Sequence, residues 1–250
     1  MVPGAIAVIP ARLESSRFPR KALADTTGLP LIIHVARQAA KATHVQHVII
    51  VSDAEEILQS ARDHGFEARA TRADHLNGTT RIAEIAPDLD CELLVNVQAD
   101  EPEIDPIIID AAIETLQSHP ECQVGTIASW MTPEDDPQDP NLVKVVMNQA
   151  GEALYFSRAS IPHQRDGDDD TPRLKHVGLY VYRRDFLPVY ADLPATRAEE
   201  AEKLEQLRIL EHGYRIAVAI RESNHQGIDT PAQYEAFVAR QLAGDAGSQD

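Results

Sequence analysis

The sequence AIAVI (Ala5–Ile9), followed directly by PARLESSRFPRK (Pro10–Lys21), joins a short apolar run to a polar, cationic loop. The run shows no polar alternation, which is typical of a strand covered on both faces in a parallel sheet. Similar runs occur at His47–Val51 and Leu93–Val97. Apolar residues at helical spacing fill the intervals between them, over Pro30–Lys41 and Ala54–His64. This βαβαβ rhythm predicts a doubly wound α/β fold with a mostly parallel sheet flanked by helices.

The second half of the chain has a different pattern of apolar and polar residues. We expect a smaller β-rich lobe, inserted at about residues 141–193, because a Pro- and Asp-rich loop precedes it and a hairpin pattern surrounds Gln149-Ala150-Gly151. We predict one domain over residues 1–243 and a disordered tail over the polar residues 244–250. The further predicted elements are a helix Asp105–Leu116, strands Val124–Ser129, Leu142–Met147, Glu152–Phe156 and Val177–Tyr182, a helix Ala198–Glu211, a strand Arg215–Ile220 and a helix Pro231–Leu242.

Charge and composition exclude several classes of function. Acidic residues outnumber basic ones by 40 to 23, for a net charge of −17, and this field would repel nucleic acid and anionic membranes. No apolar stretch is long enough to span a membrane, and the first residues do not read as a signal peptide. Cys91 and Cys122 lie in apolar surroundings without metal-ligand spacing, which favours two buried thiols in a reducing compartment. We therefore expect a cytoplasmic protein.

The loop after the first strand is the strongest local signal for phosphate binding. It holds four cations, Arg12, Arg17, Arg20 and Lys21, in a strongly acidic protein. In open α/β sheets ligands bind beyond the carboxyl ends of the strands, where these groups would meet phosphate oxygens. The loop lacks the glycine patterns of a P-loop or a dinucleotide fingerprint, so neither an ATPase nor a dehydrogenase is indicated.

Two acids and a second loop are further candidates. Asp100 follows the third apolar run and is placed as a magnesium ligand at the end of a strand. Asp229 precedes the last helix, where it suits either an N-cap or a second ligand of the same metal. The segment Thr71–Arg81 suits either a base-binding loop or a turn in which Thr79 caps a helix that begins near Arg81.

Polar groups of the second half suit an acidic, hydroxylated ligand, because arginine can clamp a carboxylate while other side chains bond hydroxyls. The helical segment Leu204–Arg208 has a competing interpretation as an amphipathic helix with a solvated polar face. The residues concerned are Arg158, His176, Glu205 and Gln206.

Taken together and in this order, the segments resemble the 3-deoxy-manno-octulosonate cytidylyltransferases, or CMP-Kdo synthetases, from about Ile6 to about Arg240. No single motif decides the resemblance. The segments that carry it are Ile9–Lys21, Thr71–Arg81, Val95–Pro102, Ala153–Pro162, His176–Tyr182, Leu204–Arg208 and Gly227–Pro231.

The resemblance implies a Rossmann-like nucleotidyltransferase fold, a homodimer with part of the smaller lobe at the contact, and coupling of CTP to the acidic sugar Kdo for lipopolysaccharide synthesis. It implies Mg²⁺ on Asp100 and Asp229, and catalytic roles for Arg12, Lys21 and Asp100. It places the nucleotide on Ala11, Arg12, Ser15, Lys21, Thr71, Arg72, Asn77 and Gly78. It places the sugar on Gln98, Arg158, His176, Tyr180, Glu205 and Gln206.

Four positions depart from the pattern of the family: Arg20 and Ala99 stand where glycine is usual, Asn77 where serine is usual, and Thr80 where an acid is usual. None is a proposed metal ligand, so the reaction class is retained while the sugar stays open. The alternatives are a related acidic sugar, such as 8-amino-Kdo or a sialic-type nonulosonate, and a catalytically silent sugar-nucleotide binding protein.

Overall fold

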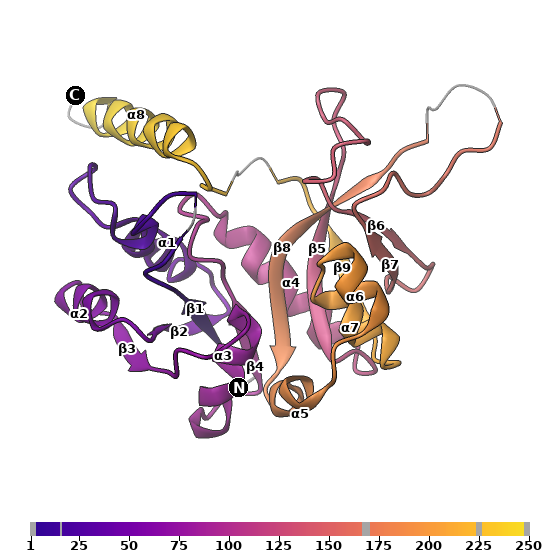
Figure 1. Cartoon of the computed structure of the whole chain (residues 1–250), viewed down its shortest axis with the longest axis horizontal. Helices are drawn as coiled ribbons and strands as arrows, with labels where there is room; N and C mark the ends of the chain where they lie inside the picture. Colours follow the sequence, from indigo (N-terminus) through magenta and orange to yellow (C-terminus); the bar gives the residue numbers. More distant parts are fainter. Residues whose placement is uncertain (1–3, 16, 167–170, 224–226, 248–250) are drawn as a thin grey trace.

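A single nine-stranded sheet forms the centre of the protein (Figure 1). The computed structural model describes residues 4–15, 17–166, 171–223 and 227–247, with side chains as far as residue 243. The main strand order is β3-β2-β1-β4-β8-β5-β9, and the hairpin β6–β7 joins the beginning of β8. The strands are β1 (Ala5–Pro10), β2 (Val45–Ser52), β3 (Glu67–Ala70), β4 (Leu93–Asn96), β5 (Val124–Trp130), β6 (Lys144–Met147), β7 (Ala153–Ser157), β8 (Leu174–Arg183) and β9 (Ile216–Ile220).

Strand β8 connects the two halves of the sheet. Strands β1 to β4 pair in parallel, as do β5 and β9, whereas β8 runs antiparallel to both of its neighbours, β4 and β5. The segment Val177–Tyr182, predicted within an inserted lobe, is therefore part of a central strand of the main sheet. What stands apart as a smaller β unit is the hairpin β6–β7.

Helices cover both faces of the sheet and bury two apolar cores. One core lies under α1, α2 and α4, and the other lies under α3, α5 and α7. Alternation along β1 divides its residues between them: Ala7 and Ile9 face the first core and Val8 faces the second. The helices are η1 (Lys21–Leu23), α1 (Leu31–Ala39), α2 (Glu55–Asp63), α3 (Gly78–Ile85), η2 (Ala86–Asp88), α4 (Pro106–Ser118), α5 (Phe186–Asp192), α6 (Arg197–Glu202), α7 (Gln206–Glu211) and α8 (Pro231–Gly247).

Most predicted elements are present, and three differ in extent. The helix predicted over Ala198–Glu211 is two helices, because Lys203 adopts a left-handed conformation (φ 53°) that ends α6. Helix α8 continues to Gly247, so residues 244–247 are helical rather than part of a disordered tail, and residues 248–250 lie outside the described residues. Helix α3 begins at Gly78 and not near Arg81.

The structure bears on two predictions from composition, the state of the cysteines and the membrane-spanning potential of the helices. Cys91 and Cys122 are free and buried, and burial raises the pKa of each thiol to about 11. Among the described residues, no helix is both long and apolar enough to cross a membrane.

Candidate active site

The cationic loop and the two acids meet at the carboxyl end of the parallel strands. Lys21 is held there by three oxygen atoms: its Nζ lies 2.9 Å from Asp100 Oδ2, 3.3 Å from Asp229 Oδ1 and 2.6 Å from the carbonyl of Ile228. Arg17 forms a further ion pair with Asp229 at 3.0 Å. The fold therefore brings Asp100 and Asp229 together, which the sequence could not establish. Ser15 lies on the same loop, half-buried.

The backbone also ties these two acids together. The Ile228 amide donates to the Asp100 carbonyl at 2.8 Å, and the Gln233 side chain accepts from the Asp229 and Thr230 amides. The preceding Gly227 passes close to Asp100, since a Cβ there would lie 3.9 Å from its carbonyl oxygen. Asp229 thus sits in a built turn and is not merely an N-cap.

Helix α8 fixes the loop that carries Lys21. The Phe18 and Tyr234 rings pack at 5.4 Å between centroids, and the Tyr234 hydroxyl accepts from the Thr26 amide at 2.9 Å. In Figure 1 α8 lies across the edge where α1 and this loop emerge. The C-terminal helix therefore positions part of the phosphate-binding candidate.

Arg20 lies in this loop at a backbone conformation that favours glycine. Its φ of 59° is left-handed, a conformation in which glycine carries no steric cost. The Arg20 side chain pairs with Glu56 on α2, outside the Lys21 cluster. Both side chains of this pair are exposed, so it contributes little to stability.

The second loop is joined to the first. Arg12 donates to the His75 carbonyl, and His75 in turn pairs with Glu84 of α3. The same Glu84 carboxylate accepts from the Arg72 amide at 3.1 Å. Of the predicted nucleotide residues, Arg72 is exposed and Ala11 is buried. Glu84 therefore holds the 72–75 segment against α3 and next to Arg12.

Thr71 and Asp53 bind the buried guanidinium of Arg81. Arg81 is 1% exposed, donates to Thr71 Oγ1 at 2.6 Å and pairs with Asp53 at 2.8 Å. Thr71 is itself buried, and its hydroxyl accepts a bond inside the protein rather than facing the cleft. Asp53 neutralises this arginine. The N-cap position of α2 belongs to Ala54.

Asn77, and not Thr79, caps α3. The Asn77 side chain accepts from the Thr80 amide at 2.8 Å, and Thr80 reciprocates toward the Asn77 amide, completing a capping box. Asn77 and Thr80 thus form one capping box at the start of α3. The next residue, Gly78, needs to lack a side chain, because a Cβ there would lie 2.9 Å from Pro10 Cγ, closer than real Cβ atoms approach other atoms. Helix α3 therefore begins directly against the end of β1.

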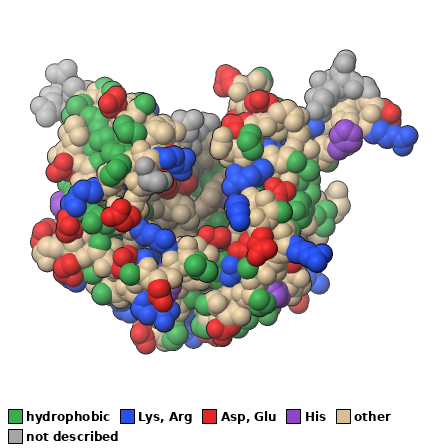
Figure 2. Space-filling model, in the orientation of Figure 1, with side chains coloured by type: hydrophobic (Ala, Val, Ile, Leu, Met, Phe, Trp, Pro, Cys, Tyr) green, Lys and Arg blue, Asp and Glu red, His purple; other side chains and the backbone are tan. Residues whose placement is uncertain are grey.

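A cavity of about 240 Å³ with several polar residues in its lining lies beside these loops. It brings together five of the six predicted sugar residues: Gln98 after β4, His176 and Tyr180 on β8, and Glu205 and Gln206 at the start of α7. Figure 2 shows a deep notch in this face of the molecule with Lys and Arg side chains on both walls. The complete lining is Gly78, Thr79, Asn96, Gln98, His176, Gly178, Tyr180, Tyr182, Lys203, Leu204, Glu205 and Gln206.

Arg158 has a different environment. It is not among the residues that line this cavity in the described ranges. Its guanidinium donates to the carbonyls of Pro140, Glu202 and Lys203. In this structure Arg158 holds the end of α6 in place rather than pointing at the proposed sugar site.

Strand β8 supplies an aromatic wall. His176, Tyr180 and Tyr182 stack in sequence, with ring centroids 5.2 and 6.0 Å apart. His176 Nε2 lies 2.9 Å from Thr126 Oγ1, which donates onward to the Leu179 carbonyl at 2.7 Å. Desolvation lowers the pKa of His176 to about 3. The ring is therefore neutral at physiological pH and acts as a hydrogen-bonding group without charge.

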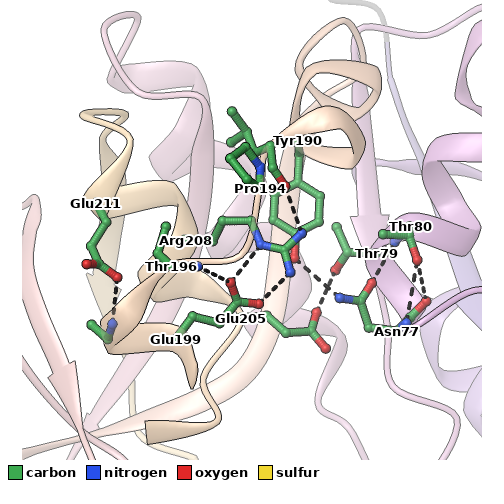
Figure 3. A network of polar contacts seen from close by, with 12 residues as sticks. Asn77, Thr79, Thr80, Tyr190, Pro194, Thr196, Glu199, Glu205, Arg208 and Glu211 are labelled. Carbon is green, nitrogen blue, oxygen red and sulfur yellow. Dashed lines mark hydrogen bonds and ion pairs between the residues drawn. The ribbon is translucent and has the colours of Figure 1, made fainter. Parts of the chain in front are cut away.

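Glu205 is the perturbed acid of the cavity. Desolvation by the neighbouring protein atoms, with the negative charge of Glu199, raises its pKa to about 7, although the residue keeps an exposed surface. Thr79 Oγ1 lies 3.4 Å from its carboxylate. Figure 3 shows Glu205 reaching toward Thr79, beside the buried pair of Arg208 and Glu199. Glu205 is thus half ionised close to neutral pH.

This raised pKa predicts a pH-dependent gain in stability for Glu205→Gln. Because the pKa of Glu205 is higher in the folded protein than in the unfolded chain, ionised Glu205 costs stability above about pH 7, and the cost vanishes below its unfolded pKa of about 4.5. We expect Glu205→Gln to raise the Tm near pH 8 and to leave it unchanged near pH 4, measured by thermal unfolding. Glu200→Gln, an exposed carboxylate on α6, is the control. A Tm difference independent of pH would contradict the assignment.

Sequence reasoning missed several cavity residues. The cavity lining also includes Lys203, Asn96 and Thr79. Lys203 reaches the cavity because its left-handed backbone interrupts the predicted helix. Asn96 carried a usable signal, since it is the polar residue of an otherwise apolar strand, 2% exposed. Gly178 also lines the cavity, where a Cβ would lie 3.8 Å from Glu101 Oε1 in ordinary van der Waals contact.

The donor set at Lys21 fits a divalent cation that is completed by a ligand. Asp100 and Asp229 supply carboxylate oxygens, the preferred partners of Mg²⁺. Within the described ranges, no group of three or more Asp, Glu, His or Cys side chains forms an all-protein metal cage. Mg²⁺ commonly binds through one or two carboxylates together with substrate phosphates and water. Two carboxylates beside a cationic loop match that pattern.

Comparison with known proteins identifies the family of the chain. A family model described as cytidylyltransferase matches residues 6–216. The 3-deoxy-manno-octulosonate cytidylyltransferase of Solibacter usitatus is 48% identical over 230 residues, covering 92% of this chain and 91% of the relative. That of Geobacter sulfurreducens is 46% identical, covering 94% and 98%.

Solved structures show the same fold. A structure of CMP:2-keto-3-deoxy-manno-octonic acid synthetase complexed with CTP superimposes with a TM-score of 0.91 at 37% identity, covering 96% of this chain and 99% of that one. The inositol-1-phosphate CTP transferase of T. maritima shares the fold at a TM-score of 0.66 and 14% identity, covering 95% and 94%. The chain belongs to the 3-deoxy-manno-octulosonate cytidylyltransferase family of the cytidylyltransferases.

Proposed function

We infer that this protein couples CTP to 3-deoxy-D-manno-octulosonate, giving CMP-Kdo and pyrophosphate. The observation that carries this conclusion is the convergence of Lys21, Asp100 and Asp229 at the strand ends that also open onto the cavity of β8 and α7. Relatives 45–48% identical over nearly the whole chain carry the name of this activity. A catalytically silent binding protein would not need both acids and the lysine.

The cationic loop would hold the nucleotide. We propose that Arg12 and Lys21 bind the triphosphate, with Ala11 and Ser15 beside them, and that the loop from Thr71 to Gly78 lines the cytosine pocket. The Arg12 contact to His75 supports this division, because it joins the two loops. Since Thr71 and Asn77 use their side chains for Arg81 and the α3 cap, we expect backbone groups of this loop to read the base.

Asp100 and Asp229 would hold Mg²⁺. When bound, the ion would neutralise phosphate charge and make the sugar hydroxyl a better nucleophile. The residues of the chain supply the remaining electrostatics, because Arg12 and Lys21 can offset the charge that develops on the leaving pyrophosphate. Holding both substrates in one cleft gives the in-line geometry, and such positioning is a large share of catalysis when little covalent work falls to the protein.

The cavity would hold the sugar acid. Its lining provides both hydrogen-bond donors and hydrogen-bond acceptors, on Gln98, His176, Tyr180, Glu205 and Gln206. Arg158 would act indirectly, through the end of α6 that precedes Lys203. In the reaction the anomeric oxygen bonds to the α-phosphorus of CTP and loses its proton to solvent. The bond from the α-phosphorus to the bridging oxygen breaks, and pyrophosphate leaves with that electron pair.

One assay separates the alternatives. Pyrophosphate release from CTP with Mg²⁺ is measured with Kdo, with 8-amino-Kdo and with a sialic acid. We expect release with Kdo. Faster release with 8-amino-Kdo or with the sialic acid would reassign the sugar but keep the reaction class, whereas no release with any of the three would favour a binding protein.

We propose a homodimer that uses the β6–β7 hairpin. Leu154 is 60% exposed and Tyr155 is 37% exposed on β7, and Trp130 at the end of β5 is 49% exposed. Exposed large apolar side chains are typical of protein contacts, although β5 and β7 do not pair directly in the sheet. Light scattering in solution tests this proposal, and a monomeric mass at high protein concentration would contradict it.

A further inference from the structure

The Lys21 ammonium lies at the atoms that the proposed function assigns to a divalent cation. Its side chain is 14% exposed, and its three contacts to Asp100, Asp229 and Ile228 match the three donors that an ammonium group carries. The Asp100 and Asp229 oxygens are therefore already neutralised from within the chain. Lys21 is the least exposed cation in this cluster, since Arg17 is 65% exposed.

We propose that Lys21 and the divalent cation compete for Asp100 and Asp229, and that the triphosphate of the nucleotide relieves this competition by accepting Lys21. This inference rests on the proposed function. Two cations that share the same pair of oxygens would stand within a few ångströms of each other, and their repulsion in a partly buried site is large. Triphosphate oxygens offer the ammonium an alternative partner. Lys21 thereby couples divalent-ion binding to nucleotide binding.

The pair of acids does not need Lys21 to stay assembled. The bond from the Ile228 amide to the Asp100 carbonyl and the Gln233 contacts to the Asp229 and Thr230 amides are all independent of the lysine side chain. Ile228 is 2% exposed and packs with Tyr234 and Phe237. Removing the ammonium therefore leaves two neighbouring carboxylates with excess negative charge, which strengthens their attraction for a divalent cation.

A purely structural lysine would behave differently. If Lys21 only braced the loop, its removal would loosen the two acids, and divalent-ion affinity would fall or stay constant. Competition predicts the opposite sign: the protein loses a stabilising ion pair and yet binds the cation more tightly. The direction of the change in affinity separates the two roles.

The experiment measures Mn²⁺ affinity without nucleotide or sugar, by calorimetry and by the EPR signal of free Mn²⁺. We expect Lys21→Met to lower the Kd for Mn²⁺ about tenfold relative to the wild type, and Lys21→Arg, which keeps the charge, to stay within about threefold. Arg20→Met removes a neighbouring charge that contacts Glu56 instead, and should leave the Kd within about twofold. An unchanged or higher Kd for folded Lys21→Met overturns the proposal.

A second measurement uses the wild type, in case Lys21→Met does not fold. Labelling by an amine-reactive reagent is followed by mass spectrometry with and without saturating Mn²⁺. We expect the cation to increase labelling of Lys21 and to leave the exposed Lys41 unchanged. Constant labelling of Lys21 overturns the proposal. Because neither measurement needs CTP or Kdo, pyrophosphate release by a protein that fails both tests would leave the proposed function intact.

Discussion

Asp100→Ala lowers turnover by about 10³-fold or more while the protein stays folded, as we expect from the position of this carboxylate. Charge stabilisation at a phosphoryl centre is worth several kcal/mol, and about 4 kcal/mol corresponds to 10³-fold in rate. Asp100 Oδ2 is also one of the three oxygens around Lys21. The fold should persist because Asp229 and the Ile228 carbonyl still hold the lysine.

The measurement is pyrophosphate release with CTP, Kdo and Mg²⁺, together with circular dichroism and thermal unfolding. Asp90→Ala is a matched control, because Asp90 is exposed and lies before β4 rather than after it. Turnover of Asp100→Ala close to that of the wild type would remove Asp100 from the site. A large drop in Tm would instead show that its role is structural.

Arg208→Met destabilises the protein by about 3 kcal/mol and weakens sugar binding, and this is the largest stability effect that we expect. Its guanidinium pairs twice with Glu199, at 2.8 and 2.6 Å, and lies 5.2 Å from the Tyr190 ring centre (Figure 3). Both charged side chains are nearly buried. Removing one partner of such a pair leaves an uncompensated charge and costs about 3–5 kcal/mol. In a chain of this size a loss of about 3 kcal/mol corresponds to roughly 6–12 °C in Tm.

The double variant tests the cause. Glu199→Leu with Arg208→Met removes both charges and should recover much of the lost stability, since a buried pair can often be replaced by apolar residues at little cost. The sugar KM should stay raised in both variants, because Arg208 belongs to the short helix that Gln206 begins. Arg215→Met is the control: its pair with Glu152 is exposed and should contribute under about 1 kcal/mol. Strictly additive losses in the double variant would contradict the ion-pair explanation.

The sequence predicted the parallel half of the sheet because its strands are buried on both faces. β1, β4 and the second half of β2 are largely apolar and buried, and their helices have regular spacing. The edge strand β3 (Glu67–Ala70) was not predicted, because it is short, charged and only half-buried. β8 was recognised as a strand but assigned to the wrong layer, since alternation along a strand does not reveal its pairing partner. The break at Lys203 was missed because a lysine carries no signal for a left-handed backbone.

The sequence indicated which kinds of residue form the site, but it did not indicate which of them contact one another. The cationic loop and Asp100 follow strand ends, and this local rule applies without knowledge of the rest of the fold. The meeting of Asp229 with Asp100 depends on a contact far apart in the sequence, so no local pattern could reveal it. Thr71 and Arg158 were assigned to ligands, but their side chains are engaged by Arg81 and by the end of α6. A polar residue that binds within the protein looks the same in sequence as one that awaits a substrate.

The contact between Lys21 and Asp229 joins residues 208 positions apart in the chain. On the ribosome, the phosphate loop emerges early, and β9 has emerged before Ile228 and Asp229 follow. A nascent chain can therefore assemble its sheet while the metal and phosphate end of the cleft still lacks one carboxylate and one carbonyl. Activity is acquired at a late stage of synthesis, so chains that terminate early should be inert toward nucleotide rather than partly active.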